Sequence, residues 1–186
     1  MMDLKVLEKK IKNCRQCQLY KSAKNAVPGE GDPRAKILLV GEAPGANEDE
    51  VGRPFCGAAG KFLDQLLDSI KLPRSKVFIT NIVKHRPPGN RDPQPDEIEA
   101  CRGYLEQQIK IIKPKIIITL GRHSKNYFLP KSAPISQIRG KIFRKKDLVI
   151  VPLYHPAAGL HQAGLKTTIE KDFKIIRQIL DKIEKE

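Results

Sequence analysis

Long apolar runs are missing from this sequence, and cysteine is scarce. No run approaches the roughly eighteen apolar residues of a membrane-spanning helix, and the first residues, MMDLKVLEKKIKN, lack the apolar core of a signal peptide. We therefore expect an intracellular, cytoplasmic protein. The chain has only 4 cysteines. In a reducing compartment, so few cysteines favour free thiols or metal ligands over a disulfide framework.

Acidic residues are outnumbered by basic ones. The chain has 35 Lys and Arg against 21 Asp and Glu, a formal net charge of +14. This excess favours a polyanionic partner, nucleic acid first, and the alternative is a basic but otherwise ordinary soluble protein. The 186 residues contain no internal repeat and no low-complexity tail. Their number suits one domain over residues 1–186, which can bury about 70% of its unfolded surface.

One stretch, KILLVGEAPGANEDEVGRPF at 36–55, has the layout of an active-site segment. Its short aliphatic run suits a strand that is buried on both faces. The run ends in GEAPG, where two glycines and a proline force a tight turn, and three acids follow. A buried strand that delivers a turn and a carboxylate to its carboxyl end is typical of α/β active sites. An ordinary strand-to-loop turn is the alternative.

The remaining pattern alternates buried strands with amphipathic helices. Strands are predicted at 37–40, 77–80, 115–120 and 148–153, and helices at 57–70, 95–112 and 168–182, after an N-terminal helix capped by Asp3. This order predicts an α/β fold, a three-layer sandwich with a central four-stranded, mainly parallel sheet flanked by helices. The segments after the strands begin at Gly41, Asn81, Gly121 and His155, and we expect them to share one cleft.

Two cysteines lie at the end of the N-terminal helix, and a third lies within the helix at 95–112. Cys14 and Cys17 form a Cys-x-x-Cys pair at a helix end, which suits half of a metal site, with a redox pair as the alternative. Cys101 lies on the apolar face of the helix at 95–112, where it is expected to be a small buried hydrophobe. The segment at 81–93 is basic and stiffened by prolines, which suits a preordered surface for phosphates.

Taken together, these motifs resemble the uracil-DNA glycosylase superfamily, and most closely its iron–sulfur branch, the family 4 enzymes. The resemblance covers nearly the whole chain and implies the same sheet. It also implies hydrolysis of the N-glycosidic bond of uracil in DNA, which leaves an abasic site. The matching segments, in the family's order, are GEAPGANEDEVGRPF at 41–55, GAAGKFL at 57–63, TNIVKHRPPGNRDP at 80–93, TLGRHS at 119–124 and YHPAAGL at 154–160, with Cys14, Cys17 and Cys101.

The resemblance assigns the recognition of a flipped uracil to four residues. Phe55 matches the aromatic on which the base stacks, and Asn81 matches the amide that accepts from N3–H and donates to O4. Cytosine presents the opposite pattern at these two positions, so Asn81 is the expected specificity residue. Glu48 matches the acid that crowds C5 and thereby excludes thymine. Gly41, at the start of the turn, completes the predicted base pocket.

The chemistry is assigned to two further residues. His155 matches the donor to the charge that develops on O2 of the departing uracil, where a preorganised donor is worth roughly 3 kcal/mol. Glu42 is the candidate for positioning or activating water and for stabilising the cationic sugar.

Leu160 matches the wedge that fills the space of the flipped nucleotide. The candidate phosphate contacts are Arg86, Arg91, Arg139 and Lys141.

His85 departs from the family pattern, which has a third cluster cysteine at this position. Three thiolates and one imidazole can still hold a [4Fe–4S] cluster, so the predicted ligands are Cys14, Cys17, His85 and Cys101. A cluster that does not use His85 and a Cys3His zinc site are the alternatives. We expect the metal group to be structural and to tie the N-terminal segment, 1–35, to the rest of the domain.

Two other functions compete with a glycosylase. A related branch that becomes trapped covalently on uracil-DNA carries a basic loop with a nucleophilic histidine, and no such insertion occurs between Pro88 and Gln94. A catalytically weak protein that binds uracil-containing or damaged DNA is the second alternative. The joint presence of Glu42, Asn81 and His155 favours the enzyme. We expect a monomer that acts on single- or double-stranded uracil-containing DNA.

Overall fold

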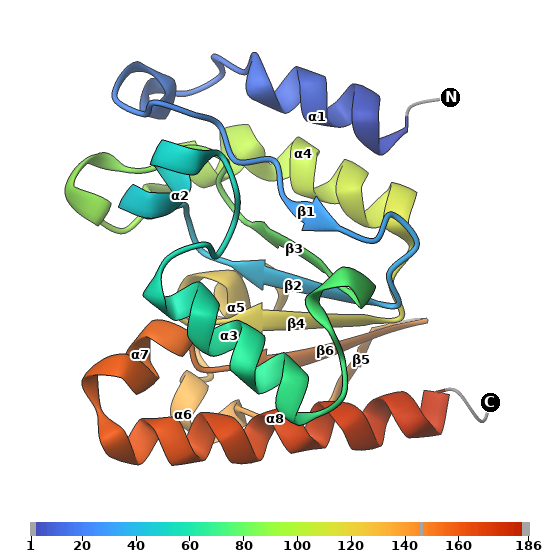
Figure 1. The fold of residues 1–186 in the computed structure, drawn as a ribbon. Helices are drawn as coiled ribbons and strands as arrows, with labels where there is room; N and C mark the ends of the chain where they lie inside the picture. Colours follow the sequence, from blue (N-terminus) through green and yellow to red (C-terminus); the bar gives the residue numbers. More distant parts are fainter. Residues whose placement is uncertain (1–2, 146, 184–186) are drawn as a thin grey trace.

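The computed structural model describes residues 3–145 and 147–183. In this part of the chain, one mixed sheet has the strand order β1-β3-β2-β4-β6-β5 (Figure 1). The four central strands are parallel, and β1 and β5 pair antiparallel at the two edges. The strands are β1 Glu30–Gly31, β2 Ile37–Gly41, β3 Phe78–Asn81, β4 Ile116–Leu120, β5 Phe143–Lys145 and β6 Leu148–Leu153.

The predicted α/β class and the four parallel strands are confirmed, but the predicted strand count of four was wrong. The described residues form six strands because β1 and β5 add one at each edge. These edge strands span only two and three residues. They carry no alternating apolar pattern, and their extended conformation comes from pairing with β3 and β6, which no local signal encodes.

The long helices agree closely with the sequence prediction. The helix at Pro95–Ile112 has the predicted bounds, and Asp3 caps the first helix by accepting a hydrogen bond from the Val6 N–H at 2.8 Å. The last helix begins earlier than predicted, at Ala163. The helices are α1 Leu4–Lys12, α2 Ala46–Val51, α3 Ala58–Ser69, α4 Pro95–Ile112, α5 Arg122–Phe128, α6 Ile135–Ile138, α7 Pro156–His161 and α8 Ala163–Ile183.

The sheet lies between two layers of helices, because its central strands carry apolar side chains on both faces and both faces must be covered. Ile37 and Leu39 on β2 belong to the core under α3 and α8, whereas Leu38 and Val40 belong to the core under α4 and α5. All four side chains are at most 1% exposed, and each such burial contributes roughly 1.5–3 kcal/mol. The first helix, α1, packs outside α4 (Figure 1). No helix of the described chain has both the length and the apolar character to cross a membrane.

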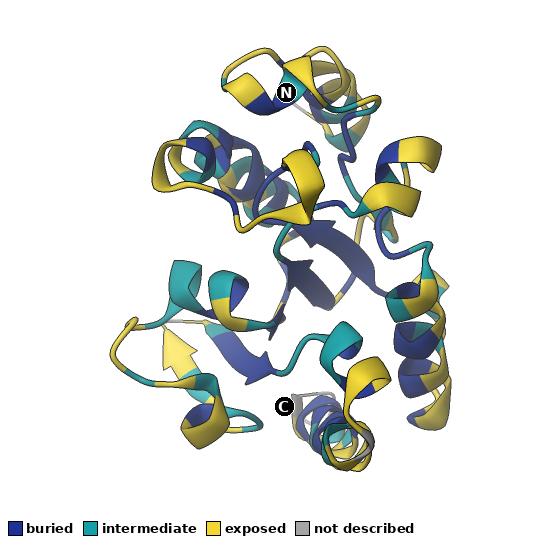
Figure 2. Cartoon of the chain, turned by 90° about the vertical axis from the view of Figure 1, so that its left-hand side faces the viewer, coloured by how far each residue is buried: buried dark blue, intermediate teal, exposed yellow. Residues whose placement is uncertain are grey.

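The parallel register brings the carboxyl ends of the strands to one edge. Gly41 at the end of β2 pairs with Asn81 at the end of β3, and Leu120 of β4 pairs with Leu153 of β6. Figure 2 looks onto this edge, where buried strands in the centre are surrounded by half-buried and exposed loops and short helices. Side chains that follow the four parallel strands therefore meet at this edge.

Candidate active site

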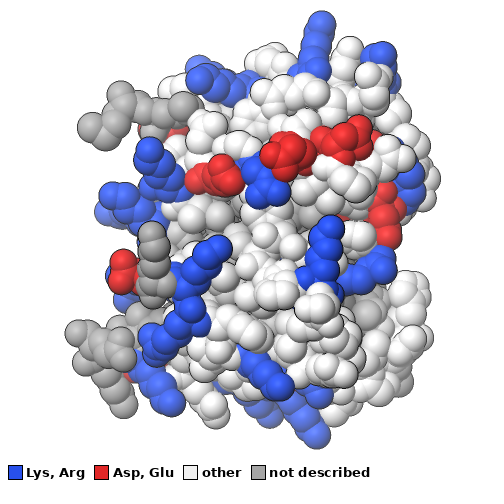
Figure 3. Space-filling view, turned by 180° about the vertical axis from the view of Figure 1, so that it is seen from behind, with Lys and Arg blue, Asp and Glu red and all other residues white. Residues whose placement is uncertain are grey.

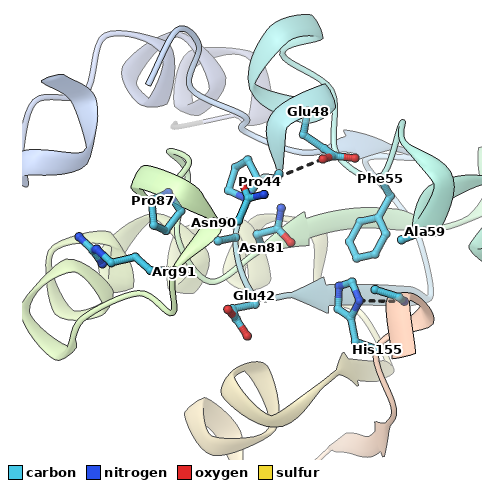
Figure 4. A pocket seen from close by; sticks show the side chains of 13 residues that line it. Glu42, Pro44, Glu48, Phe55, Ala59, Asn81, Pro87, Asn90, Arg91 and His155 are labelled. Atoms are coloured by element: carbon cyan, nitrogen blue, oxygen red, sulfur yellow. Dashed lines mark hydrogen bonds between the residues drawn. The ribbon is translucent and has the colours of Figure 1, made fainter. Parts of the chain in front are cut away.

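A cavity of about 360 Å³ opens at the carboxyl ends of the strands (Figure 4). It brings together five of the predicted pocket residues, Glu42, Glu48, Phe55, Asn81 and His155, which come from three separate segments, 41–55, 80–93 and 154–160. Arg91 also lines it, although the sequence predicted a phosphate contact there. The other lining residues are Ala43, Pro44, Gly45, Ala59, Pro87, Asn90 and Ala157.

Asn81 presents an unpaired oxygen to the cavity. Its side chain is 2% exposed, and its Oδ1 has no hydrogen-bond partner among the described residues. A buried acceptor without a partner is unusual, and it is explained if a ligand donates to it. Gly41 makes the space for this arrangement. A Cβ at Gly41 would lie 2.3 Å from the Asn81 Oδ1 and 2.8 Å from the Phe55 ring.

A fully buried lysine holds the backbone behind Asn81. Lys84 Nζ donates to the Asn81 carbonyl at 2.7 Å, to Thr80 Oγ1 at 2.7 Å and to Gln108 Oε1 at 2.8 Å. Burial lowers the pKa of Lys84 to about 7. The three oxygens use all three donors of the ammonium group, so the lysine fixes the end of β3 against α4. Sequence reasoning missed this role, because Lys84 falls in a basic segment that looked exposed.

His155 follows β6 and caps the short helix α7. Its Nδ1 accepts a hydrogen bond from the Ala157 N–H at 3.2 Å. The proton of the neutral ring must therefore lie on Nε2, which makes Nε2 a donor. Burial lowers the pKa of His155 to about 4, so the ring is neutral near pH 7. The imidazole also stacks on Phe55, with ring centroids 5.4 Å apart.

Phe55 lines the cavity from a strained backbone. Its φ of 48° lies in the left-handed region, which costs a residue with a side chain roughly 1–2 kcal/mol. The following helix allows this path only because residue 60 is glycine. A Cβ at Gly60 would lie 1.8 Å from the Phe55 carbonyl oxygen.

Glu48, on α2, ties together the loop that carries Phe55. Its Oε1 accepts hydrogen bonds from the N–H groups of Cys56 and Gly57, and its Oε2 accepts one from the Gly45 N–H, all at 3.0 Å. The carboxylate thus closes the 45–57 loop on itself. The sequence did not predict this structural contact. The exclusion of thymine by Glu48 stays a prediction.

Glu42 lies beside a histidine and a second carboxylate that sequence reasoning did not single out. His123 Nε2 is 3.0 Å from Asp92 Oδ2 and 3.8 Å from Glu42 Oε2. The TLGRHS segment brings His123 to this edge, and the 80–93 loop brings Asp92. Burial raises the pKa of Glu42, and this effect exceeds the opposing effect of His123. Glu42 therefore ionises at a higher pH than an ordinary glutamate.

The predicted metal ligands lie away from the cavity, near the N-terminal segment. All four cysteines of the chain are free thiols. A hydrogen bond from Cys101 lowers the pKa of Cys17 to about 6. His85 is 5% exposed, its Nδ1 has no partner among the described residues, and it lines a second cavity together with Cys14.

This donor set fits a metal group. Thiolates and imidazole are the ligands that zinc and iron–sulfur centres take. The close approach of Cys17 and Cys101 and the orphaned imidazole nitrogen of His85 are both explained if a metal group binds there.

The predicted DNA contacts differ in how they are held. Leu160 on α7 is 47% exposed, and Lys141 is exposed. The three arginines have partners within the protein: Arg86 donates to Asn90, Arg91 pairs with Glu97, and Arg139 pairs with Asp172. On the back of the molecule, basic side chains are spread around a row of acidic ones, so that face has mixed charge (Figure 3).

Comparison with known proteins agrees with this site. The model of the uracil DNA glycosylase superfamily matches residues 28–181. This match shows that the chain belongs to the uracil-DNA glycosylase superfamily. The base-sized pocket at the carboxyl ends of the parallel strands agrees with that family. The resemblance noted in the sequence is confirmed.

Individual relatives show which types of enzyme within the superfamily this chain is similar to. A type-4 uracil-DNA glycosylase from Sulfurisphaera tokodaii is 50% identical, over 96% of this chain and 86% of the relative. A type-4 enzyme from Archaeoglobus fulgidus is 43% identical, over 98% and 96%. A type-5 uracil-DNA glycosylase from Thermus thermophilus is 40% identical, but only over 52% of this chain and 50% of the relative. The two type-4 enzymes named here are thus similar over nearly the whole of this chain.

Proposed function

We propose that this protein is a monofunctional uracil-DNA glycosylase of the type-4 kind, which hydrolyses the N-glycosidic bond of uracil in DNA and leaves an abasic site for base excision repair. One observation carries the proposal. The unpaired oxygen of Asn81, the ring of Phe55 and the imidazole of His155 line a single cavity at the carboxyl ends of the strands. The near-full-length similarity to type-4 enzymes supports the same function.

The cavity suits recognition of a flipped uracil. Extrusion of the base costs a few kcal/mol, which contacts in the pocket must offset. The orphaned Oδ1 of Asn81 accepts N3–H, and the amide N–H donates to O4. Phe55 supplies the stacking surface, and Glu48, at the edge of the cavity, excludes the methyl group of thymine. Cytosine lacks a proton on N3 and is rejected by the same amide.

His155 and Glu42 carry the chemistry in this proposal. The bond between C1′ and N1 breaks with its electron pair on uracil, and the Nε2–H of His155 donates to O2, where the negative charge develops. A neutral imidazole suits this role because it can donate without first binding a proton. Water bonds to C1′, and Glu42 accepts its proton after stabilising the cationic sugar. The electron pair and the proton are thereby accounted for.

A metal group held by Cys14, Cys17, His85 and Cys101 has a structural part in this proposal. A [4Fe–4S] cluster is our first choice and a zinc ion the alternative, since both take thiolate and imidazole ligands. When bound, the group supplies a cross-link and no catalytic chemistry. These four residues would thereby join the segment before β1 to the loop after β3 and to α4.

The DNA is held by the rim of the cavity. Leu160 enters the space left by the flipped nucleotide, and its exposed position on α7 supports this role. The phosphates contact Arg86, Arg91, Arg139 and Lys141. The three arginines can contact phosphates only through guanidinium N–H groups that do not already bind a partner within the protein. We propose a monomer that acts on uracil in single- or double-stranded DNA.

Cleavage of a uracil-containing oligonucleotide tests the function. Wild type should leave alkali-labile abasic sites at uracil and leave thymine and cytosine intact. His155→Ala should bind the same DNA but cleave it about 10²- to 10³-fold more slowly. Binding without cleavage by both proteins would instead identify a damage-binding protein, and a stable crosslink between wild type and uracil-DNA would identify the covalently trapped type.

A further inference from the structure

Arg74 lies outside the cavity but contacts the backbone of the residue that forms its aromatic wall. It begins a short 3-10 turn, Arg74–Lys76, just before β3. Its Nη1 donates to the Phe55 carbonyl at 3.1 Å, and its Nη2 donates to the Pro54 carbonyl. The guanidinium therefore bridges two consecutive carbonyl groups. Arginine is suited to this, because its N–H groups form a rigid fork.

Two carboxylates fix the guanidinium in place. Glu30 on β1 accepts from Nε at 2.9 Å and from Nη2 at 2.7 Å, and Asp64 on α3 accepts from Nη1 at 2.9 Å. The Arg74 side chain is only 21% exposed. Partners from an edge strand and from a core helix thus orient the fork toward the loop.

The loop requires such a support because its conformation is unfavourable on its own. Phe55 is a bulky residue with φ 48°, and its carbonyl oxygen lies so close to Gly60 that no side chain fits there. A strained backbone persists only where the surroundings hold it. Arg74 and Glu48 provide this from two directions, since Glu48 binds N–H groups of the same loop.

We propose that Arg74 is a positioning residue that fixes the strained Pro54–Phe55 backbone and thereby sets the plane on which uracil stacks. The inference rests on the proposed function, in which Phe55 contacts the base. Arg74 itself does not touch the substrate. Its effect on the reaction passes through Phe55.

Arg74→Lys tests the proposal, because lysine keeps the positive charge but cannot bridge both carbonyls while held by two carboxylates. We expect kcat/KM for uracil-DNA to fall roughly tenfold, in the range of one base–aromatic stacking contact. Arg53→Lys is the matched control. Arg53 shares Glu30 with Arg74, at 2.8 Å from Nε, and within the described residues its polar contacts involve neither carbonyl. Its kcat/KM should stay within about twofold of wild type.

A double-mutant cycle separates positioning from a general structural effect. If Arg74 acts through Phe55, Arg74→Lys should lower kcat/KM no further in a Phe55→Ala background. An equal loss in both backgrounds, or no loss in the wild-type background, would overturn the inference. Asp64→Asn, which keeps the arginine and loosens one of its anchors, should give a smaller loss in the same direction. This variant replaces Arg74→Lys in the cycle should Arg74→Lys fail to fold.

The same assays distinguish this inference from the proposed function. Wild type that does not cleave uracil-DNA would overturn the function and, with it, the role of Arg74. Wild type that cleaves normally, together with an Arg74→Lys variant that cleaves equally well, would overturn the role of Arg74 alone.

Discussion

The cavity and the cysteine region are constructed in opposite ways. In the cavity, protein contacts hold each side chain or its backbone and leave one functional atom open: Ala157 fixes one nitrogen of His155, and Lys84 holds the carbonyl of Asn81. In the cysteine region, Cys101 donates to Cys17, and the Nδ1 of His85 has no partner among the described residues. The cavity is therefore preformed by the protein, whereas the cysteine region leaves a buried imidazole nitrogen without a protein partner, which the proposed metal group would supply.

Removal of the proposed metal group should separate the two regions most clearly. With chelator, or in Cys101→Ser, we expect a loss of unfolding free energy on the order of 10 kcal/mol, by analogy with structural zinc. Activity should fall only as the protein unfolds. Thermal unfolding and cleavage measured in parallel check this. Loss of activity while the fold is fully retained would show that the metal group does more than stabilise the protein.

The identity of the metal and of its fourth ligand has its own test. Anaerobically purified protein should contain about four irons with matching sulfide. We expect His85→Ala to lose or halve the iron and His85→Cys to restore it. Cys56→Ser is the control, because Cys56 lies at the cavity end, within the 45–57 loop that Glu48 closes. A colourless protein with one zinc would contradict the cluster.

Removal of the donor should damage the cavity without disturbing the cysteine region. His155→Ala should lower kcat by about 10²- to 10³-fold, the usual effect of losing one oxyanion donor, with the iron content unchanged. His161→Ala, at the exposed end of the same short helix, serves as the control. Single-turnover cleavage gives the measurement. A loss below about tenfold would exclude His155 as the donor.

The pH dependence should report Glu42 rather than His155. The pKa of His155 is lowered to about 4, so its ring remains neutral and able to donate at any higher pH. The pKa of Glu42 is raised, so Glu42 loses its charge first as the pH falls. We expect kcat/KM to fall about tenfold per pH unit below the Glu42 pKa. Glu42→Gln should lack this acidic limb, and a limb that persists would assign it to another group.

The smallest expected effect concerns the rim. Leu160→Ala should lower cleavage of double-stranded DNA about five- to tenfold, because the space of the extruded base is no longer filled. On single-stranded DNA there is no stack to fill, so cleavage should stay within about twofold. Comparison of the two substrates with one variant is its own control. Equal losses on both would argue against a wedge.

Local signals account for most of the fold that the sequence predicted. The helix at Pro95–Ile112 and the strand at Leu148–Leu153 were placed correctly, because periodicity and aliphatic runs lie within each segment. Because ligands bind at the carboxyl ends of parallel strands, the sequence also predicted that Glu42, Asn81 and His155 lie at one edge of the sheet.

What the sequence did not predict depends on contacts between distant segments. Arg74 reaches Phe55 across 19 residues, and Arg139 pairs with Asp172 across 33. Lys84 is buried only because Gln108 and Thr80 offer it oxygens. A charged residue looks the same in sequence whether it faces solvent or fixes a loop. These roles therefore required the structure.

The shortness of the two outer strands has a consequence for how copies of the molecule meet. A long exposed edge strand can pair with a strand of another chain, which is a common route to aggregation. Here one margin is formed by the two residues of β1, and the other by β5, whose three residues include Arg144 and Lys145. Each margin offers few backbone groups to an incoming strand, and the second also repels like-charged copies of itself. At high concentration, this enzyme should resist association through its sheet.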